Sequence, residues 1–293
     1  MQPMVQGKTS ANPTQVPRIF DEPLLATRLE RAARRTARRG PSFLLARMVD
    51  DLAERLHDVT RTFGSLLLIA PYGTDTLLRE RLSPAKTPAA ITLRTPAHHT
   101  RLGLPAESFD LVVALLGPGM VNDLPGALIE ARRLLQPDGL LIAAWLGGQT
   151  LTELRAALYA DDEARRGGLS PRVHPGVDHH QAAQLLGRAG LALPVVDTDR
   201  LTVRYGALQT LVDDIRDLGL SNALVARDPH FLGKATLREL ARRYPVEEGR
   251  YPATFEVLWL TGWAPHADQP VPLKPGSATT RLADALGTTE RKL

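Results

Sequence analysis

Short turns follow three apolar segments of this sequence, and such turns hold nucleotide-like ligands in open α/β sheets. A residue without a bulky side chain lets the ligand approach the backbone, and a hydroxyl or carboxylate can bind ribose hydroxyls. The residues of interest at these turns are Ala70, Tyr72, Gly73, Arg94, Thr95, Leu116 and Gly117.

The first turn is poor in glycine, since it reads Ala70-Pro71-Tyr72-Gly73. Pro71 has no N–H to donate, and Tyr72 adds bulk where a small residue would suit a ligand. Thr95 can offer one hydroxyl at the second turn, but no carboxylate ends the segment before it. Two interpretations stay open: a remodelled site that still binds its cofactor, or a protein that kept the fold and lost cofactor binding.

Histidines gather in one segment, which contains His174, Asp178, His179 and His180. Two histidines and one carboxylate could hold a non-haem iron. The spacing matches no ligand motif, however, and Asp178 directly precedes a helical pattern, where aspartate caps the first turn. We therefore expect an N-cap at Asp178 and no metal site. A second pair, His98-His99, lies in a segment with no predicted element.

Several charged residues could either face a pocket or form structural ion pairs. Glu256 is the most informative, because its neighbours Phe255, Val257 and Leu258 are apolar. A carboxylate buried among them would need a partner. The other candidates are Glu153, Arg155, Arg172 and Arg204 with the adjacent Tyr205. No residue is assigned a catalytic role.

Composition bounds the class of protein. The chain has 293 residues, is 43% hydrophobic and has no cysteine, which suits one sizeable core without disulfides or thiolate metal sites. Its longest apolar runs are far shorter than a bilayer span, and its first residues lack a secretory pattern, so we expect a cytoplasmic protein. Aromatic residues are only 5% and do not alternate with basic ones, so we expect no nucleic-acid partner.

An arginine-rich stretch near the N-terminus carries much of the net charge of +4. It could be a solvated helix, with arginines pairing with Glu30, or it could touch an anionic membrane surface. The residues for that membrane contact are Arg28, Arg31, Arg35 and Arg38.

The hydrophobic pattern predicts two helices, over 21–39 and 42–62, before a change at Gly64. Strands and helices then alternate from 65 to 148, which indicates an α/β fold with a mostly parallel, doubly wound sheet and helices on both faces. Later we expect strands at 191–197, 200–205 and 252–262. The predicted organisation is a disordered tail (1–17), N-terminal helices (18–64), one α/β domain (65–264) and a loose C-terminal tail (265–293).

The segments FDLVVALL (109–116) and NDLPGALIEARRLLQPDGLLIAAWLGG (122–148) resemble the second half of a class I methyltransferase. In that Rossmann-like fold a strand beginning Phe-Asp is followed by a helix that ends in a Leu-x-Pro-x-Gly turn, here 135–139. The resemblance implies S-adenosylmethionine as the cofactor. It also implies that the turn residues bind it, which makes Ala70, Tyr72, Gly73, Arg94, Thr95, Leu116 and Gly117 the candidate cofactor-binding residues.

More narrowly, the chain is similar over about residues 18–277 to the methyltransferase-like, arginine-hydroxylating assembly factors of respiratory complex I and their bacterial relatives. The resemblance implies a protein that binds S-adenosylmethionine and modifies a side chain, an arginine, of a complex I subunit. A non-catalytic assembly scaffold with the same fold is the alternative. The matching stretches are Ile19-Phe20-Asp21, VNDLPGAL (121–128), LGGQTLTELR (146–155), GLSPRV (168–173), Val203-Arg204-Tyr205, PATFE (252–256) and LTGWAP (260–265).

Overall fold

The computed structural model describes residues 16–96, 102–229 and 234–270. Most of both predicted tails and the pair His98-His99 lie outside the described residues. The elements, in chain order, are α1 (Glu22–Arg39), α2 (Phe43–Asp58), β1 (Ser65–Ile69), α3 (Thr74–Arg81), β2 (Ala90–Arg94), β3 (Phe109–Leu115), η1 (Pro118–Met120), α4 (Leu124–Leu134), β4 (Leu135–Leu146), α5 (Thr152–Arg166), α6 (His179–Arg188), β5 (Ala192–Tyr205), α7 (Leu208–Asp217), α8 (Lys234–Arg243) and β6 (Tyr251–Trp263).

The sheet has six strands in the order β2-β1-β3-β4-β6-β5. Strands β1 to β4 run parallel to one another, and β6 pairs antiparallel with both β4 and β5. This arrangement confirms the predicted mostly parallel α/β fold. From β1 the chain proceeds to β2 on one side and then to β3 on the other, so the switch point of the topology lies between β1 and β3.

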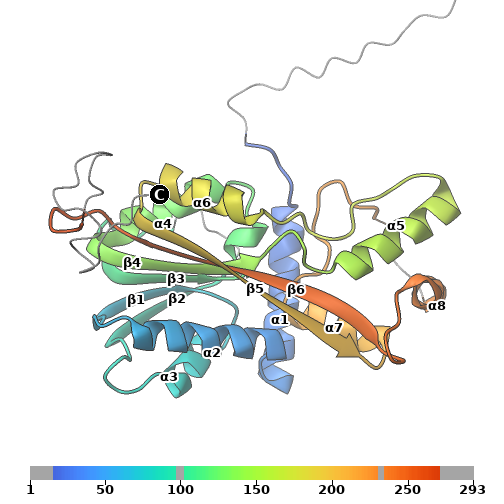
Figure 1. Ribbon diagram of the computed structural model, residues 1–293, viewed down its shortest axis with the longest axis horizontal. Coiled ribbons are helices and arrows are strands. Elements are labelled where there is room, and N and C mark those ends of the chain that lie inside the picture. Colours follow the sequence, from blue (N-terminus) through green and yellow to red (C-terminus); the bar gives the residue numbers. More distant parts are fainter. Residues whose placement is uncertain (1–15, 97–101, 230–233, 271–293) are drawn as a thin grey trace, which may run out of the picture.

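Helices cover both faces of the sheet, and each face has its own apolar core (Figure 1). Leucines and Met48 of α2 pack with α3 against one face, together with residues of α5, α7 and α8. The helices α4 and α6 pack against the other face. Strands β1, β3 and β4 are buried on both sides, which is why they read as continuous apolar runs in the sequence.

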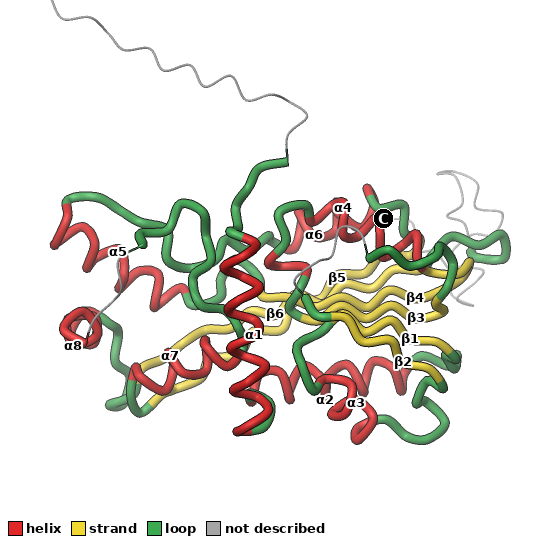
Figure 2. The backbone as a smooth tube through the Cα atoms, turned by 180° about the vertical axis from the view of Figure 1, so that it is seen from behind, coloured by secondary structure: helices red, strands yellow, loops and turns green. Residues whose placement is uncertain are grey.

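Helix α1 stands apart from both layers and crosses the ends of the strands (Figure 2). Its Arg- and Ala-rich sequence buries only Leu25 and Ala32. Thr36 approaches Gly73, with 3.8 Å from the Thr36 methyl to the position that a Cβ on Gly73 would take. The helix also packs against α7. The predicted N-terminal helix thus forms a wall over the carboxyl end of the sheet.

Two sequence predictions were wrong in detail. The strands expected at 191–197 and 200–205 are one strand, β5, which pairs with β6 along almost its whole length. The Leu-x-Pro-x-Gly segment is not a free turn, since β4 begins at Leu135 and pairs there with Phe109 before the register shifts. Gly139 is needed there because a Cβ would lie 2.8 Å from the Gln136 carbonyl oxygen.

Candidate functional site

The carboxyl ends of β1 to β4 frame the candidate site, as expected for an open α/β sheet. Two of the cavities there contain predicted cofactor-binding residues. One, of about 230 Å³, lies between α1 and the turn after β1. The other, of about 90 Å³, lies beyond the ends of β3 and β4. The predicted cofactor-binding residues that line a cavity are divided between these two: Tyr72 and Thr95 line the first, and Leu116 lines the second.

The first cavity brings together Tyr72 and Thr95, two of the predicted cofactor-binding residues. Tyr72 is 54% exposed. Gly73 adopts a left-handed conformation (φ 83°) that leads into α3. Glu30 of α1 and Asp217 of α7 also line this cavity. These two carboxylates were missed in the sequence, because they come from helices far from the turn that they face.

The remaining predicted cofactor-binding residues differ in whether they line a cavity. Leu116 lines the second cavity and has a positive φ of 63°. Ala70 is buried and donates its N–H to the Arg94 carbonyl, so its backbone holds the strands together. The Arg94 guanidinium donates to the neighbouring Leu93 carbonyl. The two cavities described above are not lined by Ala70, Arg94, Gly73 or Gly117.

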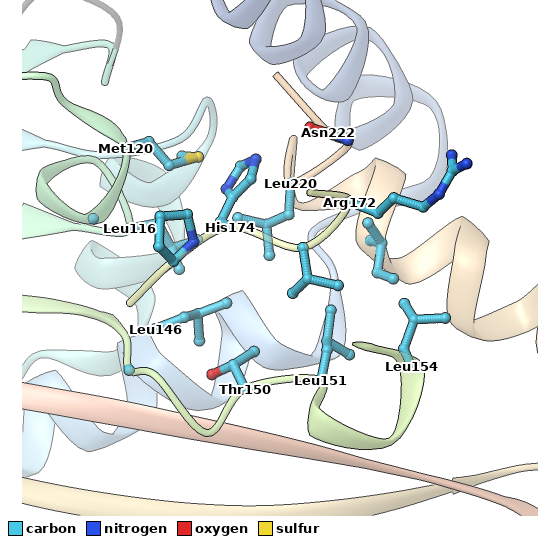
Figure 3. A pocket seen from close by; sticks show the side chains of 15 residues that line it. Leu116, Met120, Leu146, Thr150, Leu151, Leu154, Arg172, His174, Leu220 and Asn222 are labelled. Atoms are coloured by element: carbon cyan, nitrogen blue, oxygen red, sulfur yellow. The ribbon is translucent and has the colours of Figure 1, made fainter. Parts of the chain in front are cut away.

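The second cavity has mostly apolar walls. Figure 3 shows the His174 ring beside Met120 and Leu220, with Leu146 and Leu151 nearby. The polar side chains in its wall are Thr150, Arg172, His174 and Asn222.

His174, in the wall of this cavity, has a strongly lowered pKa. Burial and, second, the positive charge of Arg28 lower the pKa of His174 to about 4, although a hydrogen bond to the Ser221 backbone works in the opposite direction. Its Nε2 atom is buried and has no hydrogen-bond partner. Phe20 meets the ring edge-to-face, with 5.2 Å between ring centroids. The imidazole is therefore neutral near pH 7.

The segment that holds His174 is pinned on both sides. Before it, the Arg172 guanidinium donates to both carboxylate oxygens of Asp162 (2.9 and 2.7 Å) and lies 3.5 Å from a carboxylate oxygen of Asp228. After it, Gly176 crosses the end of β4, where a Cβ would lie 2.5 Å from the backbone carbon of Gly147. Arg172 therefore has a structural role in an ion-pair network with a nearly buried centre.

Glu256 is buried and, as predicted, has partners. Its carboxylate accepts from Arg200 of β5 (2.8 Å) and from the Gln149 N–H (3.2 Å). Its backbone exchanges hydrogen bonds with the Thr150 hydroxyl. A Cβ on Gly147 would collide with the Glu256 carboxylate. Glu256 thus shapes the loop after β4 from outside the cavity.

Three other charged candidates also have structural roles. Glu153 accepts from the Thr254 N–H and hydroxyl (3.0 and 2.5 Å). Arg155 donates to the carbonyls of the loop after β4. Arg204 pairs with Glu247 on the surface. Tyr205 is buried, and its burial raises the pKa of its hydroxyl well above the ordinary value.

The prediction for the histidine cluster is confirmed at Asp178. Its carboxylate accepts from the Gln181 N–H (2.8 Å), and the Gln181 side chain accepts from the Asp178 N–H, so α6 begins with a capping box. Nδ1 of His179 lies 3.2 Å from the Thr198 hydroxyl. The described residues contain no group of three or more His, Cys, Asp or Glu side chains that could hold a metal ion.

The pair Asn122-Asp123 in the VNDLPGAL stretch connects distant segments. The Asn122 amide oxygen accepts from the N–H groups of Ile19 and Phe20 (2.8 Å each), and its NH₂ donates to the Phe20 carbonyl (3.1 Å). Asp123 caps α4 by accepting from the Gly126 N–H (2.8 Å). Asn122 thereby holds Phe20 against His174.

The arginine-rich helix has two kinds of arginine. Arg28 and Arg35 turn inward: the Nε of Arg28 is buried, and Arg35 bonds Asp217 of α7. Arg31 and Arg38 are exposed. Contact with an anionic membrane surface stays a prediction that rests on these two. No helix in the described parts of the chain is long and apolar enough to cross a bilayer.

The mostly parallel six-stranded sheet, with helices on both faces, fits the α/β fold of class I methyltransferases. The family description "Methyltransferase domain" matches residues 74–143, starting at the first residue of α3. A putative methyltransferase from Bacillus halodurans aligns with 75% of this chain and 99% of its own, at 13% identity and a TM-score of 0.46.

Three similar proteins define the family more specifically. The human mitochondrial arginine-hydroxylase NDUFAF5 is 32% identical over 288 residues, which are 91% of this chain and 83% of that protein. The rat protein gives the same identity over 289 residues, with the same coverage. A malonyl-[acyl-carrier protein] O-methyltransferase from Gallionella capsiferriformans is 34% identical over 56% of this chain and 55% of its own. This chain belongs to the methyltransferase-like family of the arginine-hydroxylase NDUFAF5.

Proposed function

We propose that this protein binds S-adenosylmethionine at the carboxyl end of its sheet and acts on a side chain of a partner protein. The observation that carries the proposal is the cavity between α1 and the turn after β1. Its wall includes the turns after β1 and β2, at the carboxyl end of the strands, where ligands bind in open α/β folds. Family membership points to the same cofactor.

The side chains around this cavity could contact both the purine and the ribose of an adenosyl group. The exposed ring of Tyr72 offers an aromatic face to a purine. The Thr95 hydroxyl and the Glu30 carboxylate offer hydrogen-bonding groups to ribose hydroxyls, a role that a strand-end carboxylate has in dinucleotide sites. Pro71 contributes no N–H, so fewer backbone donors face the methionine part.

When bound, S-adenosylmethionine supplies an activated methyl group. The residues of this chain would bind and orient it, since methyl transfer depends on positioning more than on proton transfer. By analogy with the family resemblance, we propose a protein substrate in the assembly of respiratory complex I. The relatives are named as mitochondrial arginine-hydroxylases; arginine as the target, the reaction type and a cytoplasmic location remain proposals for this chain.

Calorimetric titration of the whole chain with S-adenosylhomocysteine and S-adenosylmethionine tests cofactor binding. We expect saturable binding, weakened about tenfold by Glu30→Gln, because a charged hydrogen-bond acceptor is replaced by a weaker, neutral one. Glu80→Gln is the matched control. Glu30 and Glu80 are exposed glutamates on helices, each near an arginine of its own helix (3.7 and 3.9 Å), but Glu80 does not line the cavity.

Two results would contradict the proposal. If neither ligand binds at millimolar concentration, the cofactor assignment is wrong, and a scaffold without a cofactor becomes the better account. If binding occurs but Glu30→Gln and Glu80→Gln weaken it equally, the cofactor binds outside the cavity at Tyr72.

A further inference from the structure

A surface groove of about 590 Å³ lies among segments that are far apart in the chain. Residues of the segment before α1, the loop after β4, the first half of α5, the segment before α6 and the segment after α7 contribute to its wall. The groove shares no described lining residue with the cavity at Tyr72. It is therefore a separate feature of the surface.

Hydrogen bonds hold the walls of this groove together. The Val225 N–H donates to the Ile19 carbonyl (2.9 Å), which joins the segment after α7 to the segment before α1. The Asn222 amide donates to the Pro171 carbonyl (2.9 Å), which joins the segment after α7 to the segment before α6. The groove is therefore preformed, and a partner that binds there pays little for ordering its walls.

Two arginines give the groove a positive charge. The Arg155 guanidinium donates to the carbonyls of Gly148 and Thr150 (3.1 and 3.3 Å), and Gly148 is itself part of the groove wall. These bonds fix the guanidinium at the wall and leave it further N–H donors. Arg18, also in the wall, is exposed. Among the described residues, no carboxylate pairs with either arginine and none lines the groove.

The rest of the groove wall combines exposed apolar side chains with one aromatic ring. Ile19 and Val225 are 40% and 51% exposed. Tyr159 of α5 is partly exposed and also lines the groove. Exposed apolar patches mark interaction sites, and tyrosine and arginine are enriched where proteins meet. This composition favours a protein partner over a small ion.

We propose that this groove docks an acidic segment of a partner protein. Its carboxylates pair with Arg18 and Arg155, and its apolar side chains pack against Ile19 and Val225. Charge complementarity selects this occupant, because a basic segment would be repelled and a neutral one would cover both arginines without pairing them. The proposal names the surface that meets the partner protein and rests on the proposed function for the role of that partner, but docking itself needs no cofactor.

Two matched peptides test the docking without any cofactor. The capped peptide Leu-Glu-Val-Glu-Leu has acidic and apolar side chains, and its counterpart Leu-Gln-Val-Gln-Leu differs only in charge. NMR titration of the whole ¹⁵N-labelled protein measures both affinities. We expect the acidic peptide to bind about tenfold more tightly, because it forms two partly exposed ion pairs. It should shift the amide resonances of Gly148 and Gly176 in the groove wall, and added salt should reduce its advantage.

Variants place the charge effect in the groove. Arg18→Gln should weaken the acidic peptide about threefold and leave the neutral one unchanged, as expected for one exposed ion pair. Arg79→Gln is the matched control, because Arg79 is an exposed arginine of α3 outside the groove, and it should change neither affinity.

Three results would overturn the docking proposal. These are equal affinities for the two peptides, no shift at Gly148 and Gly176 with millimolar acidic peptide, or equal weakening by Arg18→Gln and Arg79→Gln. Displacement of the peptide by inorganic phosphate at equal concentration would also overturn it, since the groove would then bind anions in general. Loss of S-adenosylmethionine binding would leave peptide binding intact, so the two proposals can fail separately.

Discussion

Acidification should destabilise this protein through His174, in a pH range set by its surroundings. The pKa of His174 is about 4 in the folded protein, compared with about 6.5 for an exposed histidine. Between pH 4 and about 6.5, the unfolded chain therefore binds a proton at His174 that the folded protein does not bind. Folding stability is highest above the unfolded pKa and falls as pH drops from about 6.5 toward 4.

The size of this effect follows from the two pKa values. A difference of this size makes the free energy of unfolding at pH 4 about 3 kcal/mol lower than at pH 7, an order-of-magnitude value. Burial is the main cause, so the effect should resist added salt more than a surface interaction would. The charge of Arg28 is the second cause.

Urea denaturation at several pH values between 4 and 7 measures this linkage. His174→Gln is the informative variant, because it removes the titrating group and keeps an amide. Other groups also titrate in this range, including Asp51 and Asp214, whose pKa values are raised mainly by burial. The difference between the unaltered protein and the variant removes their contribution. If the difference in free energy of unfolding between the unaltered protein and His174→Gln stays constant from pH 7 to pH 4, His174 is not a neutral, desolvated group.

Three substitutions test the framework around the cavity. Asn122→Ala should lower the free energy of unfolding by about 2–3 kcal/mol and increase hydrogen exchange in residues 19–20, because it removes three hydrogen bonds to that segment. Arg172→Met should cost about 3–5 kcal/mol by urea denaturation, since it leaves Asp162 buried without its main partner. Gly176→Ala should shift the backbone amide resonance of Gly147 and lower the melting temperature, because its Cβ would overlap the Gly147 backbone; unchanged spectra would contradict this packing.

The layered fold could be predicted because the signals for it are local. Buried parallel strands need continuous apolar runs, and surface helices need apolar residues at three- and four-residue spacing. The alternation of strands and helices over 65–148 and the N-cap at Asp178 follow from such patterns and are confirmed. The break expected within 191–205 was wrong, because long-range pairing with β6 overrides weak local preferences.

The sequence by itself determined the fold class and the family, because each depends on short contiguous patterns. Only the tertiary structure decided which side chains share a cavity. Glu30 reaches the turn at Tyr72 because α1 crosses the strand ends, and His174 becomes buried because its segment folds over the end of β4. Burial and the proximity of residues far apart in the chain arise only from long-range packing, so they leave no local pattern in the sequence.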